Sequence, residues 1–122
     1  MSRYTLRVIS RFEAAHHLTS YGGAPEPIHG HSWKVEAVLA TNHLGDEGMA
    51  YDFVAIKKHL DELTGRFHHL HINDVPPFDQ LSPTTERIAA YFFDQLAERL
   101  PDAPWQSVTV WEGPLCSATY SP

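Results

Sequence analysis

Residues 28–39 read Ile-His-Gly-His-Ser-Trp-Lys-Val-Glu-Ala-Val-Leu, and this stretch decides both the fold and the candidate site. Apolar and polar side chains alternate from Trp33 to Leu39, which is typical of a β-strand with one buried face. Residues two apart in a strand point to the same side of the sheet. His29 and His31 therefore share the buried face of Trp33, provided that the extended conformation reaches back to them. We expect a strand over residues 31–42.

A second strand is predicted over residues 3–16, antiparallel to the first. Its buried face carries apolar residues at alternate positions: Tyr4, Leu6, Val8 and Phe12. His16 continues this phase, whereas His17 falls in the opposite one.

Three imidazoles, those of His16, His29 and His31, are thus directed at one interior. The chain has nine histidines, so chance pairs are common and a lone His-x-His pair is more often incidental than metal-binding. A third histidine in phase on a neighbouring strand favours a metal site. Three neutral imidazoles suit Zn²⁺, which takes nitrogen ligands at about 2.0–2.1 Å and leaves a fourth position for water or substrate.

Composition limits the class of protein. The 122 residues correspond to one domain, residues 1–122. No apolar run approaches the ~20 residues that a membrane span needs, and the N-terminus has no signal-peptide core. The single cysteine, Cys116, excludes an internal disulfide and fits a reducing cytoplasm. A net charge of −6 argues against a general nucleic-acid surface.

Two helices are predicted in the middle of the chain, after a turn-rich loop over residues 20–27. The first starts at Phe53 with Asp52 as its N-cap, and the apolar residues that follow recur at helical spacing. The second has Ser82 as its N-cap and Pro83 at its first position, and prolines end it after residue 100.

Strands over residues 105–112 and 115–120 complete the chain. The order ββααββ predicts an α+β domain, with two helices on one face of an antiparallel sheet. Four strands leave both sheet edges open, and open edges are usually covered by pairing or assembly, so we expect an oligomer. Cys116, in the last strand, is expected to be a small packed side chain.

Two glutamates are candidate functional residues. Glu112 shares the phase of Val108 and Val110, and a carboxylate on the core face is costly unless it is paired. It either rotates out at the strand end or accepts two parallel N–H donors, as a guanidine-like heterocycle edge provides. Glu26 lies in the loop three residues before His29. It is either a solvated surface charge or a general base near the metal.

A further histidine-rich stretch contains His68, His69 and His71. Its side chains are interpreted as a second metal cluster, a proton relay or polar connectors, and the sequence pattern alone leaves these three open.

Taken together, these motifs resemble the family of 6-pyruvoyltetrahydropterin and 6-carboxytetrahydropterin synthases, over nearly the whole chain. The segments 12–16 (FEAAH) and 29–31 (HGH) are similar to the zinc-ligand motifs of that family. The segment 67–73 (FHHLHIN) is similar to its Leu-Asp-His-x-x-Leu-Asn motif, and Asp52-Phe53 opens the first helix as it does there. The segments 83–86 (PTTE) and 110–112 (VWE) resemble its two pterin-binding stretches.

The resemblance implies a fold, an assembly and a substrate. Family subunits have the T-fold (tunnelling fold) and pair their sheets into a trimeric barrel, and two barrels stack into a homohexamer with active sites between subunits. The implied substrate is 7,8-dihydroneopterin triphosphate. Zinc would act as a Lewis acid on the oxygens of the substrate side chain. Glu112 would bind the amino-pyrimidine edge of the pterin, with Thr84 and Thr85 beside it.

Two departures from the family pattern concern the catalytic residues. Most members have a catalytic cysteine four residues before the His-Gly-His motif, and here that position is Pro25. The segment 26–31 (EPIHGH), which begins with Glu26, is similar to that of the branch that uses glutamate as the base. That branch releases 6-hydroxymethyl-7,8-dihydropterin, a folate precursor. His68 stands where the family usually has the aspartate that orients the neighbouring histidine, here His69. A histidine does not supply the fixed negative charge that stabilises an imidazolium.

We therefore predict a zinc-dependent lyase of the folate branch, with Glu26, His69 and His68 as its catalytic residues. The alternatives are a 6-carboxytetrahydropterin synthase of the queuosine pathway and a non-catalytic paralogue that binds pterin or metal. A cupin-type oxidase also uses a His-x-His motif, but it needs more strands than this chain supplies and has no need of two central helices.

Overall fold

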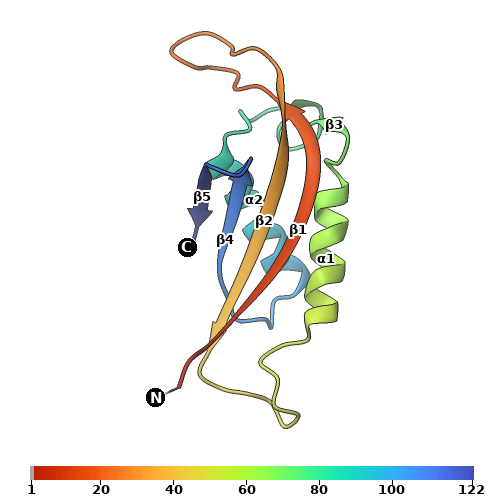
Figure 1. Ribbon diagram of the computed structural model, residues 1–122, viewed down its shortest axis with the longest axis vertical. Coiled ribbons are helices and arrows are strands. Elements are labelled where there is room, and N and C mark those ends of the chain that lie inside the picture. The colour runs from red at the N-terminus through yellow and green to blue at the C-terminus, as the bar shows by residue number, and fades with distance from the viewer. Residues whose placement is uncertain (1) are drawn as a thin grey trace.

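Two long strands, β1 (Tyr4–His16) and β2 (His29–Thr41), form an antiparallel hairpin that runs the length of the molecule (Figure 1). The structure is a computed structural model and describes residues 2–122. The remaining elements, in chain order, are α1 (Phe53–Gly65), β3 (Leu70–His71), the 3-10 helix η1 (Ile72–Asp74), α2 (Thr85–Arg99), β4 (Trp105–Glu112) and β5 (Ser117–Tyr120).

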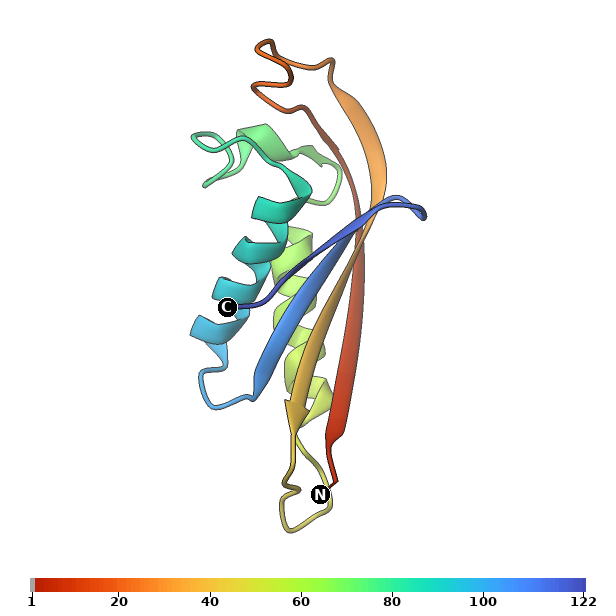
Figure 2. The same cartoon turned by 90° about the vertical axis from the view of Figure 1, so that its left-hand side faces the viewer.

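The sheet has the order β3-β1-β2-β4-β5, and both helices cover one of its faces (Figure 2). Core side chains fill the space between these two layers. Phe12 and Trp33, which are partners in the β1–β2 register, stack with their ring centroids 5.8 Å apart and meet the buried stripes of the helices. The predicted α+β class with helices on one face is confirmed. None of the helices in residues 2–122 is long and apolar enough to cross a bilayer.

The sheet contains a fifth strand that the sequence pattern did not predict. Leu70 and His71 pair in parallel with Ala14 and Ala15, so β3 forms one edge of the sheet beside β1. The sheet is therefore mixed and not wholly antiparallel. A two-residue strand has no hydrophobic periodicity, and it forms because the outer edge of β1 offers backbone groups that need partners.

The second helix starts two residues later than predicted. Thr84 is its N-cap and accepts a hydrogen bond from the Arg87 N–H, so Pro83 precedes the helix. The hydroxyl of Ser82, the predicted cap, accepts from the Thr19 N–H instead. A contact from a distant loop thus engages the serine, and the threonine caps the helix in its place.

Three expected core positions are exposed, whereas the predicted start of the first helix is confirmed. Tyr4, the first residue of β1, is 40% exposed. The Asp52 carboxylate accepts from the Val54 N–H and caps α1. Phe53 is half exposed because it lies at the first residue of the helix, beyond the edge of the buried stripe. Cys116 is exposed, because β5 begins only at Ser117 and the cysteine lies in the segment that connects β4 to β5.

A buried hydroxyl on β1 ties the sheet to α1 and leads to a prediction on stability. Ser10 donates a hydrogen bond of 2.6 Å to Asp61, which also pairs with Lys57 at 3.0 Å. Burial raises the pKa of Asp61, but the Ser10 hydrogen bond and Lys57 outweigh it and lower this pKa. The carboxylate therefore stabilises the fold above its unfolded-state pKa of about 3.9, and this contribution is lost as the pH falls through the lower folded-state pKa.

We expect the free energy of unfolding to fall more steeply below pH ~4 in the parent than in Asp61→Asn, because an amide does not titrate. Urea unfolding at several pH values measures both slopes. Equal slopes would show that the ionisation of Asp61 contributes nothing to the free energy of unfolding.

Candidate metal centre and active site

Four side chains converge where β1 and β2 approach the loop that joins them. His16 and His29 are direct partners in the β1–β2 register, and Glu112 at the end of β4 is opposite Trp33. One ligand atom from each of His16, His29, His31 and Glu112 lies within 4.8 Å of the other three. The strand phase thus places the three predicted histidines together, and the β2–β4 pairing adds the carboxylate.

Main-chain carbonyl groups orient two of the imidazoles. Nδ1 of His16 lies 3.0 Å from the Pro83 oxygen, and Nδ1 of His29 lies 2.9 Å from the Pro27 oxygen. A carbonyl only accepts, so each Nδ1 carries the proton and donates it. In each neutral ring, Nε2 then has a free lone pair directed into the cluster, as metal-binding histidines require.

The donor atoms fit a bound cation. Nε2 of His16 and Nε2 of His29 are 3.1 Å apart, and in the neutral rings each presents a lone pair to the other. Two nitrogens on a tetrahedral zinc lie about 3.3–3.4 Å apart. Nε2 of His31 is buried without a hydrogen-bond partner in the described chain, although Glu112 Oε1 lies 2.8 Å away, because that contact lacks hydrogen-bond geometry. A metal ion would satisfy all three nitrogens.

The ionisation of the cluster also suits a metal. Burial lowers the pKa of His16, and the Pro83 carbonyl and Glu112 offset this only partly. The ring is therefore held in the neutral form that a ligand must have. Burial raises the pKa of Glu112, but the hydrogen bond from the Thr85 hydroxyl, at 2.7 Å, and the nearby histidines lower it overall. Its carboxylate is thus anionic beside the imidazoles.

Glu26 reaches the cluster from the loop between β1 and β2. Its Oε1 accepts from the Leu18 N–H at 2.8 Å, and its own N–H donates to the Leu18 carbonyl at 3.1 Å. This pair of bonds closes the loop and holds the carboxylate 3.9 Å from Nε2 of His29. Only 18% of the side chain is exposed. Glu26 is therefore a partly buried, positioned carboxylate and not a freely solvated surface charge.

A cavity of about 320 Å³ joins the predicted site residues of this region. Its lining includes His16, Glu26, Thr84, Thr85 and Glu112. Thr84 also caps α2, so its hydroxyl already accepts one hydrogen bond. Pockets of this size are typical of small-molecule sites. No cysteine is among the residues that line it.

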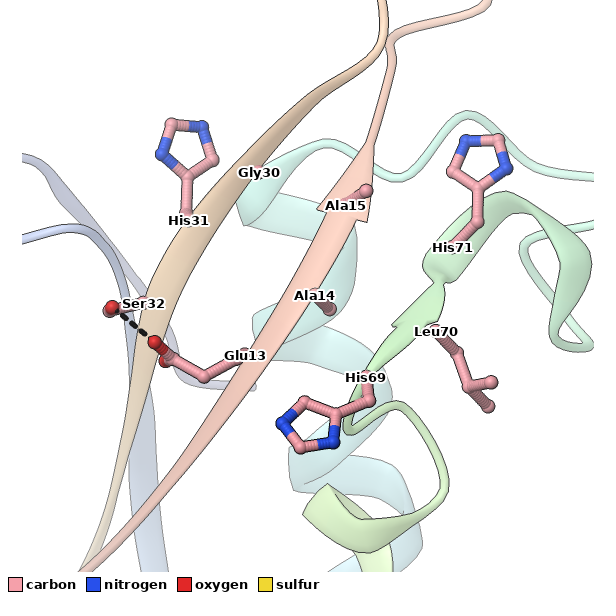
Figure 3. A pocket seen from close by; sticks show the side chains of 9 residues that line it. All are labelled: Glu13, Ala14, Ala15, Gly30, His31, Ser32, His69, Leu70 and His71. Carbon is pink, nitrogen blue, oxygen red and sulfur yellow. Dashed lines mark hydrogen bonds between the residues drawn. The ribbon is translucent and has the colours of Figure 1, made fainter.

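His68 and His69 do not line the cavity that contains Glu26. His69 lines a different cavity, of about 650 Å³, together with Glu13, His71 and His31 of the cluster. In Figure 3, His69 and His71 come from the segment beside β1, whereas His31 projects from β2. Glu26 thus lies beside His29 and lines a cavity with His16, whereas His69 lines a cavity with His31 and not with Glu26.

Sequence reasoning missed two features of the site. The carbonyls of Pro27 and Pro83 orient the imidazoles, and no side-chain pattern reports a main-chain acceptor. Glu112 was predicted as a ligand-binding carboxylate, but not as a neighbour of the imidazoles. The core-facing phase of Glu112 on β4, combined with a pairing of β4 with β2, was the signal that would have placed it beside the imidazoles.

Comparison with known proteins agrees with this geometry. A family model described as 6-pyruvoyl tetrahydropterin synthase matches residues 5–122. The 6-carboxy-5,6,7,8-tetrahydropterin synthase of Synechocystis is 38% identical over 92 residues, which cover 71% of this chain and 70% of that protein. The 6-pyruvoyl tetrahydrobiopterin synthase of Poecilia reticulata is 33% identical over 112 residues, covering 80% and 76%.

Solved structures extend the agreement to the whole fold. The 6-pyruvoyl tetrahydropterin synthase of Caenorhabditis elegans superposes with a TM-score of 0.86 at 25% identity, covering 100% of this chain and 97% of that one. The five-stranded sheet with two helices is thus the T-fold. With a histidine cluster that can hold a metal ion and a matching family model over nearly its whole length, the chain belongs to the 6-pyruvoyl tetrahydropterin synthase family.

Proposed function

We propose that the protein is a zinc-dependent pterin synthase that acts on 7,8-dihydroneopterin triphosphate. The proposed reaction is retro-aldol cleavage of the substrate side chain, which releases 6-hydroxymethyl-7,8-dihydropterin. The observation that carries this proposal is the carboxylate of Glu26, which lies 3.9 Å from His29 and lines a cavity with His16 and Glu112 that contains no thiol. His16, His29 and His31 are the proposed metal ligands.

The chain's own residues account for the proton transfers. A zinc ion bound to the three histidines would supply Lewis-acid polarisation of the substrate side-chain oxygens. Glu26 accepts the proton of the hydroxyl beyond the breaking bond, so that oxygen becomes a carbonyl as the carbon–carbon bond cleaves. The bonding electrons pass to the carbon attached to the pterin, which then takes up a proton. We assign that acid–base work to His69, with His68 beside it.

Assembly is part of the proposal, because His69 does not line the cavity that holds Glu26. A homo-oligomer in which a neighbouring subunit brings its His69 to that cavity would complete the site. The backbone edges at β3 and β5 are available for such pairing. We propose a hexamer built as a dimer of trimers, and light scattering of the purified protein measures the subunit number.

Glu112 is the proposed anchor for the pterin ring. Oε2 is held by Thr85 and Oε1 faces the histidines, so the carboxylate has a fixed orientation inside the cavity. Glu112→Gln replaces one acceptor oxygen by a donor, and we expect it to weaken pterin binding by about 1.5–3 kcal/mol. Titration calorimetry with a pterin, paired with zinc analysis, separates this role from metal binding. Unchanged pterin affinity would make Glu112 structural, and lost zinc would make it a metal ligand.

A second candidate function is 6-carboxy-5,6,7,8-tetrahydropterin synthesis, which the 38% identity with the Synechocystis protein favours. Incubation of the zinc-loaded protein with 7,8-dihydroneopterin triphosphate, followed by chromatography, separates the two. We expect 6-hydroxymethyl-7,8-dihydropterin as the main product. A 6-carboxy product would move the protein to the other branch, and unchanged substrate would overturn the proposed activity.

A further inference from the structure

Side chains attach the segment 68–73 to the outer edge of β1. The Glu13 N–H donates to Nδ1 of His68 at 3.0 Å, and the Glu13 carbonyl accepts from the His69 N–H at 2.6 Å. At the other end, the Asn73 amide accepts from the His17 N–H at 3.1 Å and donates to the His17 carbonyl at 2.9 Å. The side chains of His68 and Asn73 thus continue the hydrogen bonding between β3 and β1 beyond each end of the two-residue strand.

The bond to Glu13 defines the tautomer of His68. A main-chain N–H only donates, so Nδ1 of His68 must present its lone pair, and the ring proton of the neutral imidazole sits on Nε2. A proton on Nδ1 would break the bond and leave the Glu13 N–H without this acceptor. The position therefore requires an acceptor atom one bond beyond Cγ, which asparagine also has and phenylalanine lacks.

His69 depends on this arrangement for its orientation. Its φ of 62° lies in the left-handed region, which residues other than glycine seldom occupy. Its ring stacks on His68, with centroids 3.7 Å apart and planes inclined by 29°. The side chain lines the cavity shown in Figure 3, where Ser32 holds the Glu13 carboxylate with a hydrogen bond of 2.6 Å. The turn, the stack and the bond to Glu13 together direct the ring of His69.

We propose that His68 is a positioning residue for His69, acting through the acceptor bond to the Glu13 N–H and the ring stack. This rests on the proposed function, in which His69 exchanges protons with the substrate. His68 itself transfers no proton in this account. It keeps the His69 turn docked on β1 and presents an uncharged face to the neighbouring ring.

The test compares two variants. His68→Asn keeps a hydrogen-bond acceptor, whereas His68→Phe keeps an aromatic ring but has no acceptor. His43→Asn, in an exposed loop, controls for the exchange of histidine by asparagine. Amide exchange by NMR reports on the Glu13 N–H. We expect exchange to accelerate about tenfold in His68→Phe, because one net hydrogen bond corresponds to about a decade in an equilibrium constant. Exchange in His68→Asn should stay near the parent.

Turnover gives the second reading. In His68→Phe we expect kcat to fall by about 10- to 100-fold, because a small misplacement of a catalytic group costs that much. KM should hold, since Glu112 and the threonines of the cavity are untouched. His68→Asn should recover most of kcat. In the parent, the imidazole ¹⁵N shifts of His68 should show the proton on Nε2.

The outcomes separate this inference from the proposed function. If the Glu13 amide is protected equally in all variants, or if His68→Asn loses as much kcat as His68→Phe, the positioning role is overturned. A parent without turnover overturns the proposed function. The amide exchange and the ¹⁵N shifts then still decide whether His68 places the His69 turn.

Discussion

Replacing His31 by alanine is expected to abolish tight zinc binding while leaving the fold intact. Nε2 of His31 is buried without a hydrogen-bond partner in the described chain, so a cation is its natural partner. Changing a residue that merely orients a metal ligand costs about 10–100-fold in metal affinity, so loss of a direct ligand should cost more than ~100-fold. Metal analysis of the purified variant, with a zinc titration, measures the loss.

Thermal unfolding supplies an independent reading of the same change. Zinc at 100 times its dissociation constant should stabilise the parent by about 2.7 kcal/mol, and the same concentration should barely stabilise the variant. His17→Ala is the matched control, because Nδ1 of His17 contacts Nε2 of His71 at 3.1 Å, outside the cluster. Undiminished zinc in His31→Ala, or zinc lost in His17→Ala alone, would refute the assigned ligand set.

The second large effect is expected at Glu26. An unperturbed glutamate is a weak base for an alcohol, but a positioned general base contributes roughly 10²–10⁴-fold to a rate. The two bonds with Leu18 limit the orientations of this carboxylate, and it shares a cavity with His16 and Glu112. Glu26→Ala should therefore keep zinc and pterin binding and lose turnover by about that factor.

Glu26→Gln separates the base from the loop clamp. Its amide oxygen can still accept from the Leu18 N–H, whereas the amide cannot take up a proton from the substrate. We expect both variants to have similarly low kcat, with normal KM, in a chromatographic assay for 6-hydroxymethyl-7,8-dihydropterin. If Glu26→Gln turns over like the parent, Glu26 only shapes the loop. If Glu26→Ala also does so, the base is elsewhere, and His69 is the next candidate.

The periodicity of the sequence predicted most of the fold and the grouping of the histidines. The two-residue repeat from Trp33 to Leu39 and its counterpart on β1 predicted which side chains face the helices, and the burial of these positions bears this out except at the exposed Tyr4. The sequence alone groups His16, His29 and His31, because a strand leaves only two directions for a side chain. The same reasoning placed Glu112 on the core face.

Other features depend on partners that are distant in sequence. Ser82 has the better local pattern for a helix cap, but Thr19 engages its hydroxyl and Thr84 caps α2 instead. Leu70 and His71 form a strand only because the edge of β1 lies beside them. Neither outcome follows from local propensity, since each depends on which backbone groups need a partner in the folded chain.

The sequence by itself determined the two-layer α+β architecture, the face that carries the three histidines and the absence of a thiol in the loop before the His-Gly-His motif. Only the tertiary structure decided that carbonyls of Pro27 and Pro83 orient two of the imidazoles, that Leu18 holds Glu26, and that His69 does not line the cavity of Glu26. The physical reason is that alternation reports which way a side chain points. The atom that it meets depends on how distant segments pack, and main-chain acceptors leave no trace in a pattern of residue types.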